Sequence, residues 1–297
     1  MQPQELLIGA VDMHLHSGPA LTPRGFDHVE VIRSSIKAGM RAIVIKDQHV
    51  PSGNICQLLQ RYFVLQGEHF NVYGGLVLSN TQGGLNPSVV EAAIGYDTKV
   101  VWMPVLSSKY NKERMSYLSS VYPAYSNVPR PKNPLNYDPP LTILNSSKKL
   151  VPEVSDICRL IADSGIVLAT GHLSREETYQ LLDEAVKQGV KNIVITHPEY
   201  FLDFTMEEMR DLANSGFYIE HILTPLYSGK ITYDRLYELI RSNGVEHTII
   251  SSDLGQVGRP LPVKGLYDFI RAMQKCGLTD DEIHQIVSVN QHKLLGI

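Results

Sequence analysis

The feature that most constrains the fold of this chain is a series of eight short apolar runs, rich in β-branched residues, spread over its 297 residues. Each run is continuously apolar rather than alternating, which is typical of strands in a parallel sheet that is covered on both faces. The runs cover residues 8–16, 41–49, 70–80, 99–107, 165–174, 191–199, 216–223 and 247–255.

Helical patterns lie between most of these runs. Four of them begin with a capping-box spacing, in which a glutamate follows a Ser, Thr or Asp by three residues. The pairs are Asp27 with Glu30, Ser174 with Glu177, Thr205 with Glu208, and Thr279 with Glu282. We therefore expect helices over 27–38, 175–188 and 206–215, and a last helix after residue 279. Eight strands alternating with helices predict an α/β fold, the (β/α)8 TIM barrel, as a single domain over 1–297.

One stretch, residues 108–150, interrupts this alternation. It is rich in Pro, Tyr, Asn and Ser and has little apolar periodicity. An irregular segment of this length is uncommon as a simple connector. Since it follows the fourth run, it would lie at the carboxyl end of the barrel, where active sites form. We interpret it as an insertion that serves as a lid, a pocket wall or a contact in a homo-oligomer.

Composition excludes several classes of protein. The formal charge is only −4 and the chain is 43% hydrophobic, which argues against disorder and against a nucleic-acid-binding protein. We expect no membrane segment, because no run approaches 18 apolar residues. The first residues lack the basic start of a signal peptide, and the three cysteines are odd in number and far apart. We therefore expect a cytoplasmic protein with reduced thiols.

Polar residues able to bind metal follow several of the predicted strands. Their side chains would meet at one rim, because a parallel barrel gathers the carboxyl ends of its strands there. His14 and His16 share a face of the first strand, since residues i and i+2 point the same way. With the residues after the fifth, sixth and eighth strands they form a set of four His and one Asp: His14, His16, His172, His197 and Asp253. Such nitrogen and oxygen donors suit Zn²⁺, Mn²⁺ or Fe²⁺.

This arrangement resembles the amidohydrolase superfamily: an HxH on strand 1, His after strands 5 and 6, and Asp after strand 8. The closing VNQHKLLGI is similar to a tail common in that superfamily. More narrowly, SGP after the HxH, AGMRAIVIKDQH and SSDLGQ resemble an uncharacterised amidohydrolase-related family. The resemblance implies a distorted barrel with one or two divalent ions, zinc foremost. It also implies that Asp253 both binds metal and accepts a proton from the attacking water.

The chain departs from this pattern at strand 4, which ends without the bridging Lys or Glu of many binuclear members. Lys46 and His49, after the second strand, are the substitute candidates for a second metal. For Lys46 three roles stay open: a carbamylated bridge, a binder of substrate anions, or an ion-pair partner of Asp47 or Glu220. The stretch AIVIKDQH also resembles an element of the PHP phosphoesterases, although Asp253-Leu254-Gly255 lacks their D-x-H.

The function predicted from these residues is a metal-dependent hydrolase. A metal-activated water would cleave an amide, cyclic amide or lactone of a small molecule, with Asp253 and Lys46 as catalytic residues. Candidates for substrate binding are Arg24, Glu220, Gln256 and Arg259, while Glu199 and Tyr200 are candidates to orient the neighbouring His197. The alternatives are a PHP-like phosphoesterase and a non-catalytic barrel that binds a metal or a metabolite.

Overall fold

The computed structural model describes residues 1–121 and 137–297. In these residues eight parallel strands follow one another around one sheet, each hydrogen-bonded to the next in sequence order. The strands are β1 (Val11–Leu15), β2 (Ala42–Ile45), β3 (Asn71–Val77), β4 (Thr98–Trp102), β5 (Val167–Ala169), β6 (Ile193–Thr196), β7 (Tyr218–Ile222) and β8 (Thr248–Ser251). All eight predicted strands are present, although each is shorter than the apolar run that predicted it.

The two ends of the sheet meet just beyond β8 and β1. The backbone N–H of Asp253 donates to the carbonyl of His14 at 2.7 Å, and the N–H of His16 donates to the carbonyl of Leu254 at 2.8 Å. These bonds nearly close the sheet into a cylinder, so the predicted (β/α)8 barrel is confirmed. They also place the HxH sequence directly beside Asp253.

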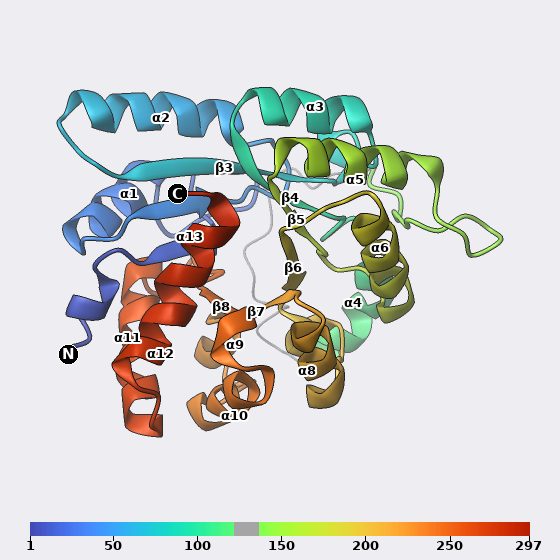
Figure 1. Cartoon of the computed structure of the whole chain (residues 1–297). Coiled ribbons are helices and arrows are strands. Elements are labelled where there is room, and N and C mark those ends of the chain that lie inside the picture. The colour runs from blue at the N-terminus through green and yellow to red at the C-terminus, as the bar shows by residue number, and fades with distance from the viewer. Residues whose placement is uncertain (122–136) are drawn as a thin grey trace.

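Helices separate successive strands and surround them (Figure 1). All four predicted capping boxes are present, with the Asp, Ser or Thr side chain accepting from the backbone N–H three residues later. In the described chain the helices are α1 (His28–Lys37), α2 (Gly53–Leu65), α3 (Pro87–Gly95), α4 (Lys109–Val121), α5 (Pro152–Ser164), α6 (Arg175–Lys187), α7 (Pro198–Phe201), α8 (Met206–Asn214), α9 (Thr224–Tyr227), α10 (Tyr233–Asn243), α11 (Pro262–Cys276), α12 (Asp280–His284) and α13 (Asn290–Leu295). Short 3-10 turns occur at Glu5–Leu7, Asn80–Gln82 and Val245–His247, and a π-helical turn, Gln285–Val289, joins α12 to α13.

The apolar core has an inner and an outer part. Alternate strand residues such as Val44, Val100 and Ile249 fill the inside of the barrel around Trp102. The other strand residues pack outward against the helices in two larger clusters. Gly75 admits the Trp102 ring, because a Cβ at residue 75 would lie 2.3 Å from its Cζ3 atom. The inner residues form the floor beneath the carboxyl end of the barrel.

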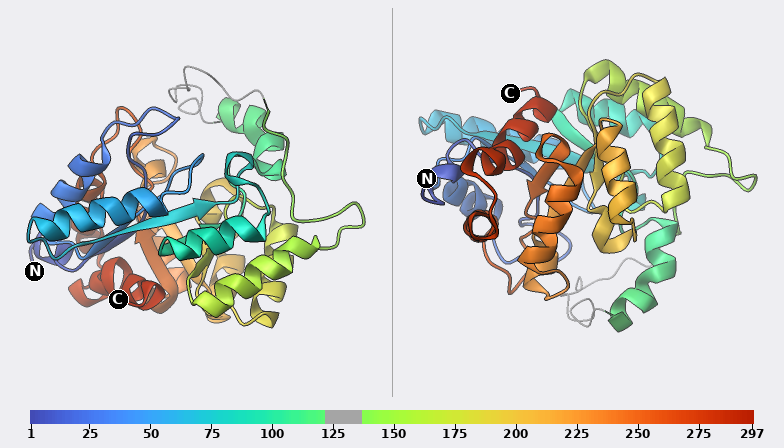
Figure 2. Two further views of the ribbon diagram at one scale, coloured as in Figure 1. Left: turned by 90° about the horizontal axis from the view of Figure 1, so that it is seen from above. Right: turned by 60° about the horizontal axis from the view of Figure 1, so that its bottom comes forward.

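The segment 108–150 is more regular than its sequence suggests. The expectation of an irregular stretch is wrong for Lys109–Val121, which form α4 at the edge of the molecule (Figure 2). Tyr110 and Met115 of this helix pack against the core, and charge pairs support it further: Lys109 lies 3.8 Å from Glu113, and Lys112 lies 2.6 Å from Asp138 on the returning chain. Part of the predicted lid, residues 122–136, lies outside the described residues.

The described chain holds no helix that combines the length and apolar character needed to cross a membrane.

Candidate metal centre

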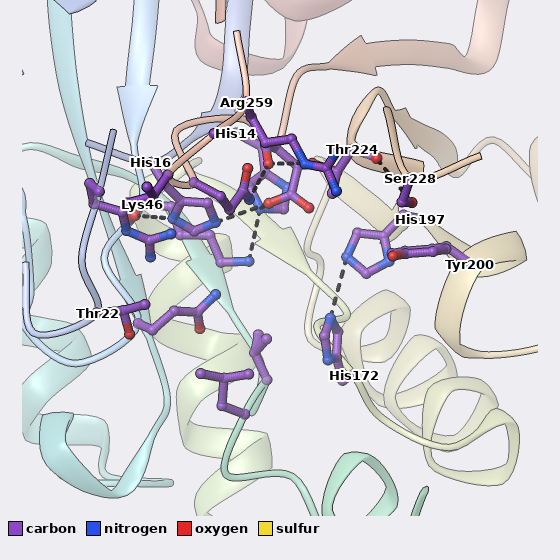
Figure 3. Close-up of a pocket in the computed structure, with 18 of the residues that line it drawn as sticks. His14, His16, Thr22, Lys46, His172, His197, Tyr200, Thr224, Ser228 and Arg259 are labelled. Carbon is purple, nitrogen blue, oxygen red and sulfur yellow. Dashed lines mark hydrogen bonds and ion pairs between the residues drawn. The ribbon is translucent and has the colours of Figure 1, made fainter. Parts of the chain in front are cut away.

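The carboxyl ends of the strands surround a cavity of about 390 Å³ (Figure 3), here called the main cavity. Six of the residues predicted as metal ligands or catalytic groups line it: His14, His16, Lys46, His172, His197 and Asp253. The alternation of side chains along each strand explains why they face the cavity. Lys46 continues the inward series of Ala42 and Val44, and Asp253 continues the inward alternation of Ile249.

The first strand needs a local irregularity to aim its histidines. Val11 and Met13 face the inside of the barrel, while Leu15 packs in the outer core. The register between β1 and β2 shifts between Asp12 and Leu15, as at a β-bulge. Because a bulge re-aims the side chains that follow it, His14 and His16 both turn towards the main cavity.

Three side chains form a compact group, here called the metal group: His14, His16 and Asp253. One potential ligand atom from each lies within 4.8 Å of the others. The Oδ1 atom of Asp253 lies 2.9 Å from Nε2 of His16 and 3.2 Å from Nε2 of His14. Backbone packing fixes this approach, because a Cβ on Gly255 would lie 1.8 Å from the carbonyl oxygen of His16.

The second nitrogen of each imidazole is held by a group that only accepts hydrogen bonds. The Nδ1 atom of His14 lies 3.1 Å from the Glu220 carboxylate, and Nδ1 of His16 lies 2.7 Å from the carbonyl oxygen of Lys46. Each Nδ1 must therefore carry a hydrogen, which leaves a lone pair on Nε2 when the ring is neutral. The lone pair of His16 faces the Asp253 oxygen. The Nε2 atom of His14 also lies 3.0 Å from Nζ of Lys46. Burial and Lys46 act to lower the pKa of His14, but the carboxylates of Glu220 and Asp253 raise it.

Two acceptor atoms facing each other at 2.9 Å repel unless a proton or a cation lies between them. Burial lowers the pKa of His16 to about 3, so this ring is neutral and holds no proton on Nε2 near pH 7. Burial tends to raise the pKa of Asp253, but His14 lowers it to well below its ordinary value, so the carboxylate is ionised. A neutral imidazole nitrogen beside a carboxylate oxygen is a donor set that fits a divalent metal ion.

His172 and His197 form a neighbouring pair of nitrogen donors. Their Nε2 atoms lie 3.3 Å apart, and Nδ1 of His172 lies 3.1 Å from the side-chain oxygen of Asn111. Burial lowers the pKa of His197 to about 4 and that of His172 well below its usual value, so both rings are neutral. The ring of His197 lies 6.1 Å from that of His14, between centroids, and the pair stands beside the metal group rather than within it.

Two of these residues have unusual backbone angles. His197 has a φ of 28° and Asp253 has a φ of 47°, a region that L-residues seldom occupy. Such strain persists where the surrounding structure holds a residue in place, and it clusters at functional sites.

Lys46 is almost fully buried at the floor of the main cavity. Its Nζ atom lies 3.0 Å from Nε2 of His14 and 4.9 Å from the centre of the Trp102 ring. Burial lowers the pKa of Lys46 to about 8, against the opposing effect of Asp253 and Glu220. Within the described chain Lys46 makes no ion pair with Asp47 or Glu220 at 4.0 Å or less. The predicted role as an ion-pair partner of these residues is therefore not supported by a contact.

Other predicted site residues have different positions. Arg24, Gln256 and Arg259 line the main cavity. Glu220 is buried behind His14 and is absent from the described lining. His49 is also absent from that lining and from the metal group, and its role as a ligand stays a prediction.

Several contacts of the site were not predicted from the sequence. Asn111, which orients His172, belongs to the segment that we expected to be irregular. Lys230 lines the main cavity and donates to the hydroxyl of Tyr200 at 2.8 Å. Its one sequence signal is a place in the loop after β7. The described residues of 108–150 do not line the main cavity. Val105 and Leu106, which precede this segment in the chain, do line it.

The barrel has the fold of the amidohydrolase superfamily, as the resemblance predicted. Solved structures with this fold include an amidohydrolase from Pseudomonas aeruginosa, at 12% identity and a TM-score of 0.63, with 99% of this chain and 98% of that chain covered. The probable dipeptidase PvdM from the same bacterium has 13% identity and a TM-score of 0.65, with 99% and 96% covered. A β-aspartyl dipeptidase from Fervidobacterium islandicum has 15% identity and a TM-score of 0.61, with 98% and 73% covered.

Within this fold, the chain belongs to the family of unknown function DUF6282, whose model matches residues 9–220. No curated protein matches the sequence.

Proposed function

We propose that this protein is a metal-dependent hydrolase that cleaves an amide, cyclic amide or lactone bond of a small molecule. The observation that carries the proposal is the metal group, in which the Nε2 atoms of His14 and His16 lie beside one ionised carboxylate oxygen in the main cavity while acceptor groups hold their Nδ1 atoms. The fold shared with hydrolases of the amidohydrolase superfamily adds support.

The residues that would hold a first divalent ion are His14, His16 and Asp253, and the His172–His197 pair would complete a first or second site. The nitrogen and oxygen donors favour Zn²⁺, with Mn²⁺ or Fe²⁺ as alternatives. Such an ion lowers the pKa of a coordinated water towards 7 and polarises a carbonyl group.

Asp253 would be the proton acceptor. Its Oδ1 atom faces both histidines, which leaves Oδ2 to take the proton from the attacking water. A carboxylate within hydrogen-bond reach can then pass this proton to the leaving group. The low pKa of Asp253 keeps it ionised, which a proton acceptor requires.

Lys46 is the second proposed catalytic residue. As an ammonium it would donate a hydrogen bond to the carbonyl oxygen of the substrate from the cavity floor. As a carbamate it would help to bind a second ion. The pKa of about 8 leaves a fraction of the amine neutral near pH 7, as carbamylation requires. Carbon-13 NMR after incubation with labelled bicarbonate distinguishes the roles, since a carbamate signal present in the wild type must vanish in Lys46→Met.

The hydrolase is tested by metal analysis and a substrate screen. Protein purified without chelator should hold one or two equivalents of a divalent metal. It should hydrolyse a member of a set of lactones and N-acyl amino acids, and lose that activity on chelation. Turnover of phosphate esters instead would indicate a PHP-like phosphoesterase. Metal without turnover of either set would favour the non-catalytic barrel.

A further inference from the structure

Outside the proposed metal ligands, three residues that line the main cavity have a buried polar side-chain atom without a hydrogen-bond partner among the described residues. These atoms are Nε of Arg24, Oε1 of Gln48 and Oε1 of Gln256. Buried polar atoms are nearly always hydrogen-bonded in folded proteins, because an unpaired one has lost its bonds to water. Three such atoms around one cavity indicate a place where a ligand supplies the partners.

Backbone pairing places Arg24 beside Gln256. The two residues form an antiparallel bridge, and the N–H of Gly25 donates to the carbonyl of Gly255 at 2.9 Å. Residues directly opposite each other in an antiparallel pair carry their side chains on the same face, with Cβ atoms about 5 Å apart. Thr22, from the same loop as Arg24, lines the cavity too (Figure 3). A guanidinium and a side-chain amide therefore reach the main cavity together from the loops after β1 and β8.

Arg24 contributes hydrogen-bond donors alone. Among the described residues its guanidinium makes no hydrogen bond, and no carboxylate lies within 4.0 Å of it. Asp47 accepts from backbone N–H groups of its own loop, and Asp253 lies against the histidines of the metal group. The paired N–H groups of a guanidinium match the two oxygens of a carboxylate. The group that complements Arg24 is therefore a carboxylate.

Gln256 contributes an acceptor. Its Nε2 atom donates to the backbone carbonyl of Asp253 at 2.7 Å. Because a carbonyl oxygen only accepts, this bond assigns the amide nitrogen to that side and leaves Oε1 to accept from another group. Gln48 is only 9% exposed and makes no side-chain hydrogen bond with the described residues, so its amide can offer either its oxygen or its nitrogen. The group that complements Gln256 is an N–H.

Resting on the hydrolase proposed above, we propose that Arg24 and Gln256, with Gln48 of the same lining, form a subsite that binds a carboxylate next to an amide N–H. The carboxylate pairs with Arg24, and the N–H donates to Oε1 of Gln256. Because Gln256 is bonded to the carbonyl of Asp253, the amide that is recognised lies next to the metal group, where it is cleaved. The substrate class is an N-acyl amino acid or a cyclic amide with a carboxylate beside its N–H, whereas a lactone has no N–H to offer.

Three probes that water does not cleave test the subsite on the wild type. Metal-loaded full-length protein is titrated calorimetrically with methanesulfonylglycine, which has both a carboxylate and an N–H. Its glycinamide lacks the carboxylate, and its N-methyl derivative lacks the N–H. We expect methanesulfonylglycine to bind, and each of the other two to bind about tenfold more weakly or worse, the loss of one hydrogen bond in a buried site.

Two variants assign the contacts. Arg24→Gln should weaken the binding of methanesulfonylglycine by about tenfold and that of the glycinamide little. Gln256→Leu should weaken the binding of methanesulfonylglycine similarly and that of the N-methyl derivative little. A general distortion of the cavity would weaken all three probes alike. The matched control is Arg159→Gln, because Arg159 lies on α5, pairs with Asp156 and does not line the main cavity. It should bind as the wild type does.

A carboxylate can also bind a metal ion directly, so the titrations are repeated after the metal has been removed with a chelator. Arg24, Gln48 and Gln256 do not belong to the metal group. The preference for methanesulfonylglycine over the other two probes should therefore remain.

Four results would overturn the subsite: no binding of methanesulfonylglycine, equal affinity for the three probes, wild-type affinity in either Arg24→Gln or Gln256→Leu, or loss of the preference when the metal is removed. Failure of the hydrolase is seen separately. Protein that holds no metal and hydrolyses nothing, yet shows the preference and loses it in the two variants, would contradict the proposed function and leave the subsite in place.

Discussion

At the residue scale, the metal group depends on which nitrogen of each imidazole carries a hydrogen. His14 and His16 sit two residues apart, yet different parts of the chain hold their Nδ1 atoms: the Glu220 side chain on β7 and the Lys46 carbonyl just after β2. The HxH spacing predicts that the two rings share a face, which they do. It carries no information on these partners, because each lies on another strand.

The first prediction separates the two roles of Asp253. Asp253→Asn keeps an amide oxygen for metal but cannot accept a proton at neutral pH. We expect turnover to fall by about 10²- to 10⁴-fold with metal content near that of the wild type. His14→Asn should instead lose metal, and added metal should restore part of its activity. Metal analysis and rate measurements on both variants check this. If Asp253→Asn keeps about a tenth of the wild-type rate or more, the proton acceptor is another residue.

The second prediction concerns Glu220, which the sequence analysis predicts as a substrate-binding residue and the structure places behind His14. Its carboxylate orients His14 from behind, so Glu220→Gln should weaken metal affinity by about 10- to 100-fold while leaving the cavity wall unchanged. Competition with a chromophoric chelator measures this. Glu184→Gln on α6 is the control, since Glu184 contacts Lys187 and Gln188 on the outside of the barrel. Equal affinity in the two variants would show that Glu220 does not support the metal group.

At the element scale, the sequence predicts the helices whose stabilising contacts lie between residues close together in the chain. The capping boxes at Asp27, Ser174, Thr205 and Thr279 mark the helix starts correctly, because the bonds that form them lie within four residues. Helix α4 was missed, since its support includes Asp138, which lies beyond the end of the helix. The bulge in β1 was missed for a similar reason, because register is a property of two strands.

The third prediction tests the junction between β1 and the chain after β8. Gly255 has a φ of 125°, and a Cβ there would lie 1.8 Å from the carbonyl oxygen of His16. Gly255→Ala should therefore separate His16 from Asp253, lower the metal content and reduce stability by more than about 2 kcal/mol. The control is Gly216→Ala, which also has a positive φ of 92° but open space around the new Cβ.

Gly216→Ala should cost roughly 1 kcal/mol from backbone strain alone and keep its metal. Chemical denaturation and metal analysis of the two variants give the comparison. Equal losses of stability, with full metal in both, would mean that the junction does not shape the metal group.

At the scale of the whole molecule, the barrel could be predicted because each βα unit is local and the units repeat. The convergence of His14, His172 and Asp253 on one rim also follows, since a parallel barrel gathers all strand ends. The cations that line the main cavity follow from the sequence in part. Arg24, Lys46 and Arg259 were predicted as site residues after the first, second and eighth strands, whereas Lys230, in the loop after β7, was not.

The last prediction concerns the stability of the whole chain. The Nε2 atom of His16 faces the Asp253 carboxylate at 2.9 Å, so the folded protein without metal keeps a repulsive contact that a cation relieves. An ion that binds the folded state alone at 100 times its Kd should stabilise it by about 2.7 kcal/mol, or roughly 4 °C for a chain of this length. Melting curves with zinc and with chelator measure the difference. His14→Asn should show a smaller difference between the two solutions, because its metal group binds the ion more weakly. If the melting temperature of the wild type is the same with zinc and with chelator, the metal group binds no metal. That result would contradict the proposed hydrolase.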